Sequence, residues 1–165
     1  MALVVEDGSG LPDAESYASV DDADTYFSLR GNAHWATLST DAKEQALRRA
    51  TDDMLQQYSG RWKGERISAS QALDWPRDGV VIDGYELPVD EIPTAIVRAC
   101  AELALRALSG SLTPDAGPEV KSKTIGPIEI VYQDGAQSAK RYTAVENLLR
   151  PYVRGGSNQI TLLRA

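Results

Sequence analysis

The stretch PTAIVRACAELALRAL, residues 93–108, decides the fold. Its polar side chains after the proline are Thr94, Arg98, Glu102 and Arg106, each four positions after the one before. Successive residues of an α-helix lie about 100° apart, so these four form one narrow polar stripe on an otherwise apolar cylinder. Such a helix lies in the middle of a bundle, and proline is favoured at its first helical position.

Shorter helices are predicted on both sides of this central one. Ser19 and Ser39 are typical N-cap residues, and the helix that follows Ser19 ends near Gly31 and Asn32. The helix over residues 39–58 carries one apolar stripe, made of Ala42, Ala46, Leu47, Ala50, Met54, Leu55 and Tyr58. A last short helix spans residues 142–152 and breaks near Pro151.

Turn-forming residues dominate between residues 60 and 91, where Asp83-Gly84 predicts a small hairpin. Two β-like runs flank Gly126-Pro127 within residues 120–132. We therefore predict a mainly α fold: a small helical bundle around one long central helix, with a β-hairpin excursion and extended N- and C-terminal arms. All 165 residues form one domain, in which residues 1–18 are an arm, 19–153 the helical core with hairpin insertions and 154–165 a tail.

The charge balance restricts how the chain could meet nucleic acid. Its 17 Lys and Arg against 24 Asp and Glu give a net charge of −7, and the N-terminal stretch is strongly acidic. This excludes sequence-independent DNA binding by the whole surface and leaves a local basic strip possible. Basic residues alternate with aromatic ones only at 61–66, RWKGER, and at 140–142, KRY. The aromatic residues there could stack on bases, or Trp62 and Trp75 could instead be buried loop anchors.

No constellation of reactive residues is visible. His34 is the single histidine, so a Ser-His-Asp triad or a histidine-containing metal site could use only this one imidazole. Cys100 is the single cysteine, which excludes an internal disulfide and a four-cysteine zinc site. There is no glycine-rich phosphate loop, no secretory signal and no apolar run of membrane-spanning length. We expect no catalysis, no cofactor, no metal and no membrane partner, and synthesis in a cytoplasm.

Three stretches carry a resemblance to known proteins: residues 15–35, residues 71–80 with 86–108, and residues 123–132 with 142–153. The most specific part is the turn LDWPR at 73–77, which leads to Ile92-Pro93 and the long helix. The pattern resembles tailed-phage and prophage proteins that are labelled DnaT-like single-stranded-DNA-binding proteins. It is also similar to the head–tail connector, or adaptor, proteins of long-tailed phages.

The connector resemblance implies the main functional expectation, a structural phage protein. It would form a homo-oligomeric ring of twelve copies beneath the portal, extend the DNA channel and dock the next neck or tail-completion protein. DNA would pass through without specific binding, and the protein, made in the bacterial host cytoplasm, would reside in the virion neck. The alternative is a single-stranded-DNA-binding protein of phage replication.

The two functional hypotheses predict different contact residues. The tail tip, with Ile160, Leu162, Leu163 and Arg164, would dock on the portal. The residues expected to form a structural turn or a subunit interface are Trp75, Pro76, Arg77, Arg98 and Glu102. Under the alternative, the nucleic-acid contacts would be Arg61, Trp62, Lys63 and Arg66.

Overall fold

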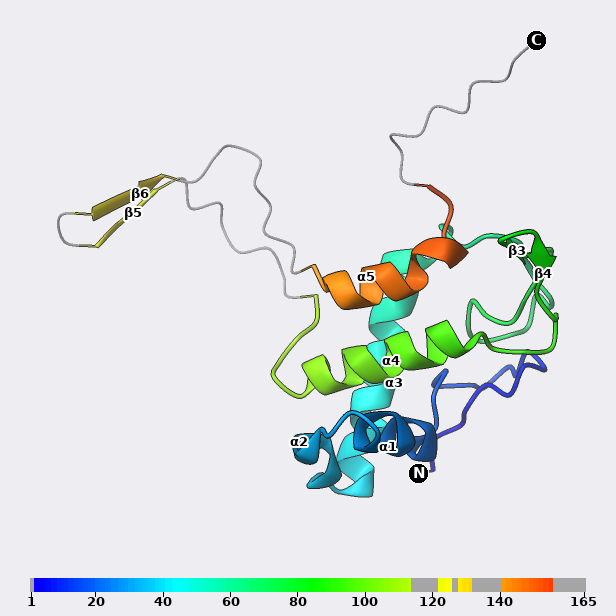
Figure 1. Cartoon of the computed structure of the whole chain (residues 1–165), viewed down its shortest axis with the longest axis horizontal. Helices are drawn as coiled ribbons and strands as arrows, with labels where there is room; N and C mark the ends of the chain where they lie inside the picture. The colour runs from blue at the N-terminus through cyan, green and yellow to red at the C-terminus, as the bar shows by residue number, and fades with distance from the viewer. Residues whose placement is uncertain (1, 114–121, 126–127, 132–140, 156–165) are drawn as a thin grey trace, which may run out of the picture.

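The computed structural model describes residues 2–113, 122–125, 128–131 and 141–155. Five α-helices and one 3-10 helix form within this part of the chain (Figure 1). They are α1 (Val20–Ser28), α2 (Ala33–Ala36), α3 (Thr40–Tyr58), α4 (Thr94–Ala107), α5 (Thr143–Leu149) and η1 (Arg150–Tyr152). The prediction of a mainly α fold is confirmed.

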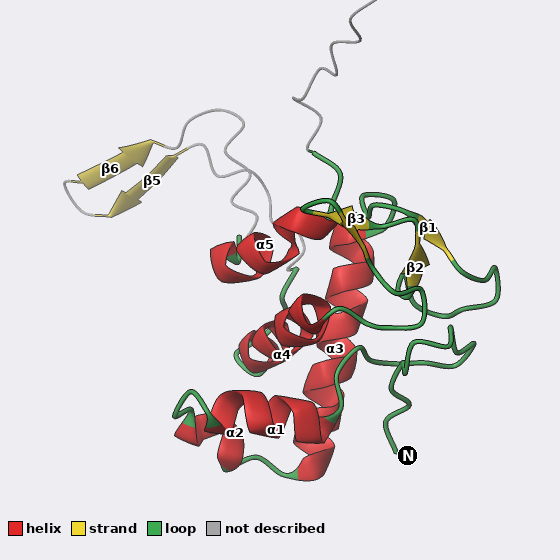
Figure 2. Cartoon of the chain, turned by 45° about the vertical axis from the view of Figure 1, so that its right-hand side comes forward, coloured by secondary structure: helices red, strands yellow, loops and turns green. Residues whose placement is uncertain are grey.

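The helices α1, α4 and α5 lie in a row across α3, and α4 is the middle one (Figures 1 and 2). Half of α4 is buried, through Ile96, Ala99, Cys100, Ala101, Leu103, Ala104 and Ala107. Its polar stripe starts exposed at Thr94 and Arg98 and then meets α1, where the Tyr26 hydroxyl donates to the Glu102 carboxylate over 2.9 Å. The predicted central helix is therefore confirmed. Its polar stripe faces solvent at Thr94 and Arg98 and contacts α1 at Glu102.

The predicted caps are present at both N-terminal helices. The Ser19 hydroxyl accepts from the Asp22 N–H at 3.0 Å, and the Asp22 carboxylate accepts from the Ser19 N–H, which completes a capping box. Ser39 caps α3 in the same way through the N–H of Ala42. Pro93 stands one position earlier than predicted, as the N-cap of α4.

The predicted N-terminal arm packs against the core. Tyr17 is 2% exposed, and the buried Glu6 carboxylate accepts from the N–H groups of Gly8, Gly10 and Leu11. Gly8 has φ +102°, and a Cβ built there would lie 1.9 Å from the Asp90 carbonyl oxygen. The backbone approach leaves room for glycine alone, so this loop is fixed against the excursion that follows α3.

Short antiparallel strand pairs supply the β-structure of the described residues. β1 (Glu65–Arg66) pairs with β2 (Arg77–Asp78), β3 (Val81–Ile82) with β4 (Tyr85–Glu86), and β5 (Ser122–Ile125) with β6 (Ile128–Val131). The β3–β4 turn has positive φ at Asp83 and Gly84, as its sequence predicts. The β5–β6 pair matches the predicted runs and stands away from the helices in Figure 1. No helix among the described residues is both long and apolar enough to cross a membrane.

Candidate nucleic-acid interface

Four aromatic rings form a column beyond the C-terminal end of α3. Tyr58, Trp62, Trp75 and Tyr152 follow one another with ring centroids 5.4, 5.8 and 5.9 Å apart. Trp62 is 1% exposed and Trp75 is fully buried. The Trp62 indole N–H donates to the Asp74 carboxylate at 3.1 Å. The two tryptophans are loop anchors, and the hypothesis that Trp62 stacks on a base is wrong because its ring has no accessible face.

Next to this column, backbone hydrogen bonds join two segments that are far apart in the sequence, residues 61–63 and 152–154. Trp62 forms an antiparallel bridge with Val153, and the Lys63 N–H donates to the Tyr152 carbonyl at 2.9 Å. The Arg154 N–H in turn donates to the Arg61 carbonyl at 2.6 Å. This pairing brings Arg154 beside the basic residues that follow α3.

Arg77 ties the turn at residues 73–77 to the same place. Its Nε donates to the Lys63 carbonyl and one terminal nitrogen to the Gly64 carbonyl, both at 2.7 Å. The other terminal nitrogen donates to the Asp74 carbonyl at 3.0 Å. Burial lowers the pKa of the Arg77 guanidinium, with Asp74 opposing and both Arg154 and Arg66 adding to the decrease. Arg77 thus holds the turn in place within the field of neighbouring cations.

We call this group the basic cluster: Arg61, Lys63, Arg66, Arg77 and Arg154. Arg61, Arg66 and Arg154 are exposed, whereas Lys63 and Arg77 are partly buried. None of the five has an ion pair within residues 2–113, 122–125, 128–131 and 141–155. The pairs found there involve other cations: Lys43 with Asp24, Arg48 with Glu15 and Glu44, Arg106 with Glu102, and Arg141 with Glu146.

The strand pair β1–β2 separates charge of opposite sign. Arg66 lies directly opposite Arg77, and Glu65 opposite Asp78. Because neighbouring residues of a strand point to opposite faces, the two arginines share one face and the two acids the other. Like charges that face each other across strands are unfavourable, so an anion bound at the arginine face would relieve the repulsion there.

The sequence identified part of this cluster and missed the rest. Arg61, Lys63 and Arg66 are among the predicted contacts, and all three lie here. Arg77 was expected at a structural turn or a subunit interface, and it lies at the turn over residues 73–77; Arg154 was not singled out. No local pattern links Arg154 to residue 61, because the two meet through backbone pairing across some ninety positions.

The other predicted site residues lie elsewhere. Pro76 is buried next to Trp75 in the turn over residues 73–77, while Arg98 is exposed on α4 and Glu102 contacts α1. At the second basic-aromatic stretch, Arg141 pairs with Glu146 at 3.3 Å. The tail residues Ile160, Leu162, Leu163 and Arg164, and also Lys140, lie outside the described residues.

Metal-binding side chains do not gather in the described part of the chain. It contains no cluster of three or more His, Cys, Asp and Glu side chains that could hold a metal ion. Cys100 is fully buried, and burial raises the pKa of its thiol. His34 is exposed on the four-residue helix α2.

Comparison with known proteins corrects the main functional expectation. One family model matches residues 1–165, and that family is described as "Putative DnaT-like ssDNA binding protein". No curated protein and no solved structure matches the chain. The connector identity is therefore wrong, and with it the expected ring beneath a portal and the neck role. The match extends over the whole chain and agrees with the alternative hypothesis: the protein belongs to the DnaT-like single-stranded-DNA-binding family.

Proposed function

We propose that this protein binds single-stranded DNA and that the basic cluster holds the phosphate backbone. The observation that carries the proposal is a set of clustered cations without carboxylate partners in the described residues, in a chain whose net charge is −7. Elsewhere on the described surface, several cations are neutralised by ion pairs. A polyanion would gain most where several such cations lie close together, as they do in the basic cluster.

Recognition would rest on phosphates. The tryptophans nearest to the cluster, Trp62 and Trp75, are buried, so they support its shape and do not offer stacking faces. Phosphate contacts position a strand without reading its sequence. We therefore expect binding that tolerates sequence and weakens steeply with salt. Four engaged cations give a slope of about −3 in a plot of log K against log salt for a single strand.

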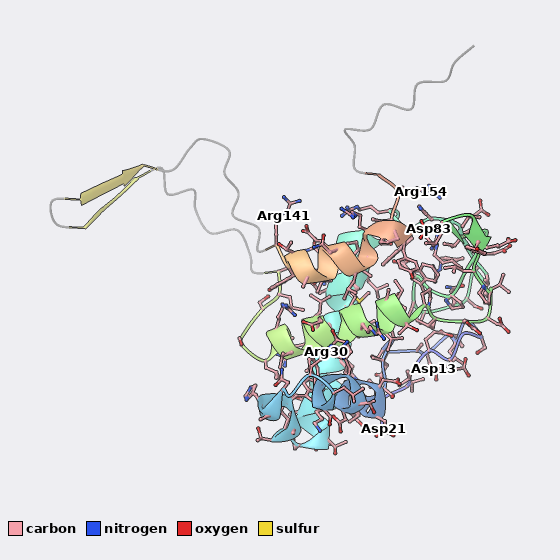
Figure 3. The ribbon with its side chains drawn as sticks, in the orientation of Figure 1. Asp13, Asp21, Arg30, Asp83, Arg141 and Arg154 are labelled. Atoms are coloured by element: carbon pink, nitrogen blue, oxygen red, sulfur yellow. The ribbon has the colours of Figure 1, made fainter. Side chains whose placement is uncertain are left out.

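The acidic surroundings would confine the strand. Glu65 and Asp78 occupy the opposite face of β1–β2, and Asp83 and Glu86 are exposed on the neighbouring hairpin. Figure 3 places Asp83 on the same side of the molecule as Arg154. Negative side chains beside the basic cluster repel phosphates that lie away from it, so the path available to the strand would be narrow.

A charge-matched pair of variants tests the proposal. The first variant combines Arg61→Ala, Lys63→Ala and Arg66→Ala. The control combines Arg30→Ala, Arg49→Ala and Arg98→Ala, which removes three exposed cations away from the cluster. Figure 3 shows Arg30 beside α1, well away from Arg154. Both variants have the same net charge, so a difference between them reports position and not total charge.

The measurement is fluorescence anisotropy of a labelled oligo-dT of about 20 nucleotides, titrated at several salt concentrations. The cluster variant should lose at least about tenfold in affinity, and its salt slope should become shallower by about 2 units. The control should stay within about threefold of the wild type. Equal losses in both variants, or an unchanged slope in the first, would overturn the proposal. A duplex that binds as tightly as the single strand would overturn the preference for single strands.

A further inference from the structure

Tyr85 is the one exposed side chain among the tyrosines, tryptophans and phenylalanines of residues 2–113 and 141–155. It is 78% exposed, and within the described part of the chain it has no ring contact, cation or hydrogen-bond partner. Trp62 and Trp75, in contrast, are at most 1% exposed. The Tyr85 ring therefore has a face open to a ligand, which the two tryptophans lack.

The β3–β4 hairpin holds Tyr85 in a fixed place. Asp83 and Gly84 have φ of +53° and +87°, as the two central residues of a tight hairpin turn require. Tyr85 follows directly and pairs with Ile82, which is partly buried against the core. Val80, at the base of the hairpin, is fully buried. The hairpin is thus anchored on its core side, while the Tyr85 side chain stays in solvent.

The base of this hairpin contacts the backbone that carries the basic cluster. A Cβ built on Gly64 would lie 2.7 Å from the Val80 side chain, so Gly64 packs directly against Val80. The Gly64 carbonyl accepts from Arg77 at 2.7 Å and from Arg154 at 3.4 Å. The cross-strand partner of Tyr85 is two positions from Val80, so at about 3.3 Å per residue the Tyr85 backbone lies within about 10 Å of Val80. The open ring and the basic cluster are therefore neighbours.

The charges around the ring decide which part of a nucleotide would face it. Asp83 and Glu86 flank Tyr85 on the hairpin, and both are exposed. Figure 3 shows Asp83 on the same side of the molecule as Arg154. Phosphates are attracted by the basic cluster and repelled by the two carboxylates. The part of a DNA strand that suits the hairpin is therefore the uncharged base.

We infer that the Tyr85 ring stacks on a base of a single strand whose phosphates lie on the basic cluster. The inference rests on the proposed function and adds a contact that discriminates against duplex DNA, because a base in a duplex is stacked and must be extruded before a side chain can cover its face. Every base has such a face, so the contact tolerates sequence.

Substitutions at Tyr85 separate stacking from a general apolar contact. Tyr85→Ala and Tyr85→Leu should each lose at least about fivefold in affinity for the labelled oligo-dT, whereas Tyr85→Phe keeps the ring and should stay within about twofold. The matched control is Leu29→Ala, which removes an apolar side chain of similar exposure, 79%, at the C-cap of α1. The control should bind like the wild type. The salt slope should stay unchanged in all four variants, because none of these side chains is charged.

A second measurement asks whether the lost affinity belongs to the bases. The probe is a strand of the same length in which every nucleotide is abasic, so that it keeps the phosphates and lacks the rings. The wild-type protein should bind this probe at least about fivefold more weakly than oligo-dT, and Tyr85→Ala should cause no further loss. The two proteins and two probes form a double-mutant cycle that isolates the contact between ring and base.

The outcomes separate this inference from the proposed function. If Tyr85→Ala binds oligo-dT within about twofold of the wild type, the stacking contact is overturned, while a loss in the cluster variant would keep the proposed function. An equal loss on the abasic strand would place Tyr85 against the sugar-phosphate backbone and would also overturn stacking. A wild-type protein that binds no oligonucleotide would overturn the proposed function, and the stacking contact with it.

Discussion

The two ends of α3 handle positive charge in opposite ways. At the N-terminal end, Lys43 pairs with Asp24, and Arg48 pairs with Glu15 and Glu44. Beyond the C-terminal end, Arg77 instead donates to backbone carbonyls, and Arg61 lies over the ring of Tyr58. A carbonyl or a ring orients a cation without cancelling its charge. Lys43 and Arg48 are therefore neutralised by their carboxylate partners, whereas the cations of the second end keep attraction for an external anion.

The difference follows from what holds each end together. At the C-terminal end the aromatic column fixes the loops, and the guanidinium groups around it donate to backbone carbonyls instead of pairing with carboxylates. At the N-terminal end the Lys43–Asp24 pair also anchors Trp35, so its charges belong to the fold. This contrast predicts that mutations at the two ends will separate stability from binding.

The largest effect is expected from breaking the aromatic column. Trp75 is fully buried between Trp62 and Tyr152, so Trp75→Ala should lower the free energy of unfolding by about 3–5 kcal/mol. Urea denaturation followed by circular dichroism measures the loss. Tyr85→Ala is the control, because Tyr85 is 78% exposed and its removal should cost less than about 0.5 kcal/mol. A loss under about 1 kcal/mol for Trp75→Ala would contradict the role of the column.

Removing a paired cation at the N-terminal end should come next. Lys43→Ala leaves the Asp24 carboxylate without its ammonium partner, but Asp24 is partly exposed and water compensates for some of the loss. We expect a decrease of about 1–2 kcal/mol in the free energy of unfolding. Lys63→Ala, which removes the same side chain at the other end, should be nearly neutral in the same denaturation assay. Similar losses for both lysines would erase the contrast between the two ends.

Measuring both DNA affinity and stability for one arginine from each end sharpens the comparison. Arg66→Ala should weaken oligo-dT binding by about threefold to tenfold and lower the free energy of unfolding by about 1 kcal/mol or less, since it loses one hydrogen bond to the Gln71 carbonyl. Arg48→Ala should do the reverse, because Arg48 is engaged with Glu15 and Glu44. Anisotropy and urea denaturation on the same two proteins give the result. A loss of DNA affinity in Arg48→Ala as large as in Arg66→Ala would place the binding surface elsewhere.

The smallest effect concerns Asp53, toward the C-terminal half of α3. Burial raises the pKa of this carboxyl, against the hydrogen bond that it accepts from the Thr113 hydroxyl at 2.6 Å. The folded protein therefore holds the Asp53 proton more tightly than the unfolded chain does. Its contribution to stability is greatest at low pH and is lost as pH rises through the raised pKa.

Asp53→Asn removes this ionisation and keeps an oxygen that can accept from Thr113. The free energy of unfolding of the variant, relative to the wild type, should rise with pH from the acidic to the neutral range. The effect should be smaller than that of Lys43→Ala. Denaturation curves at several pH values check it, and a pH-independent difference would mean that Asp53 titrates alike in both states.

Elements with a sustained pattern were predictable from the sequence. The four-residue spacing of the α4 stripe and the caps at Ser19 and Ser39 act locally, so they appear in the structure where they were expected. Helix α2 spans four residues and β1 two, which is too short for any period. The burial of Glu6 depends on loop N–H groups, and no sequence period encodes those contacts.

The candidate site was only half predictable for a related reason. Three of the basic residues stand close together in the sequence, whereas Arg77 and Arg154 join them through hydrogen bonds to the backbone at residues 61–64. A tryptophan between basic residues has the same sequence pattern whether it is exposed or buried. Its partner Asp74, twelve residues away, decides the matter for Trp62.

Because Trp62 pairs with Val153, the region around Trp62 can be completed only after the C-terminal part of the chain has been synthesised. A ribosome that has released residues 1–113 has delivered all of α1 to α4, yet Tyr152 and Arg154 are still to be made. The aromatic column then lacks its last ring and the basic cluster one of its cations. Nascent chains and C-terminally clipped products would thus fold much of the helical body without a complete binding surface. If the proposed function holds, such chains would bind DNA more weakly than the full polypeptide.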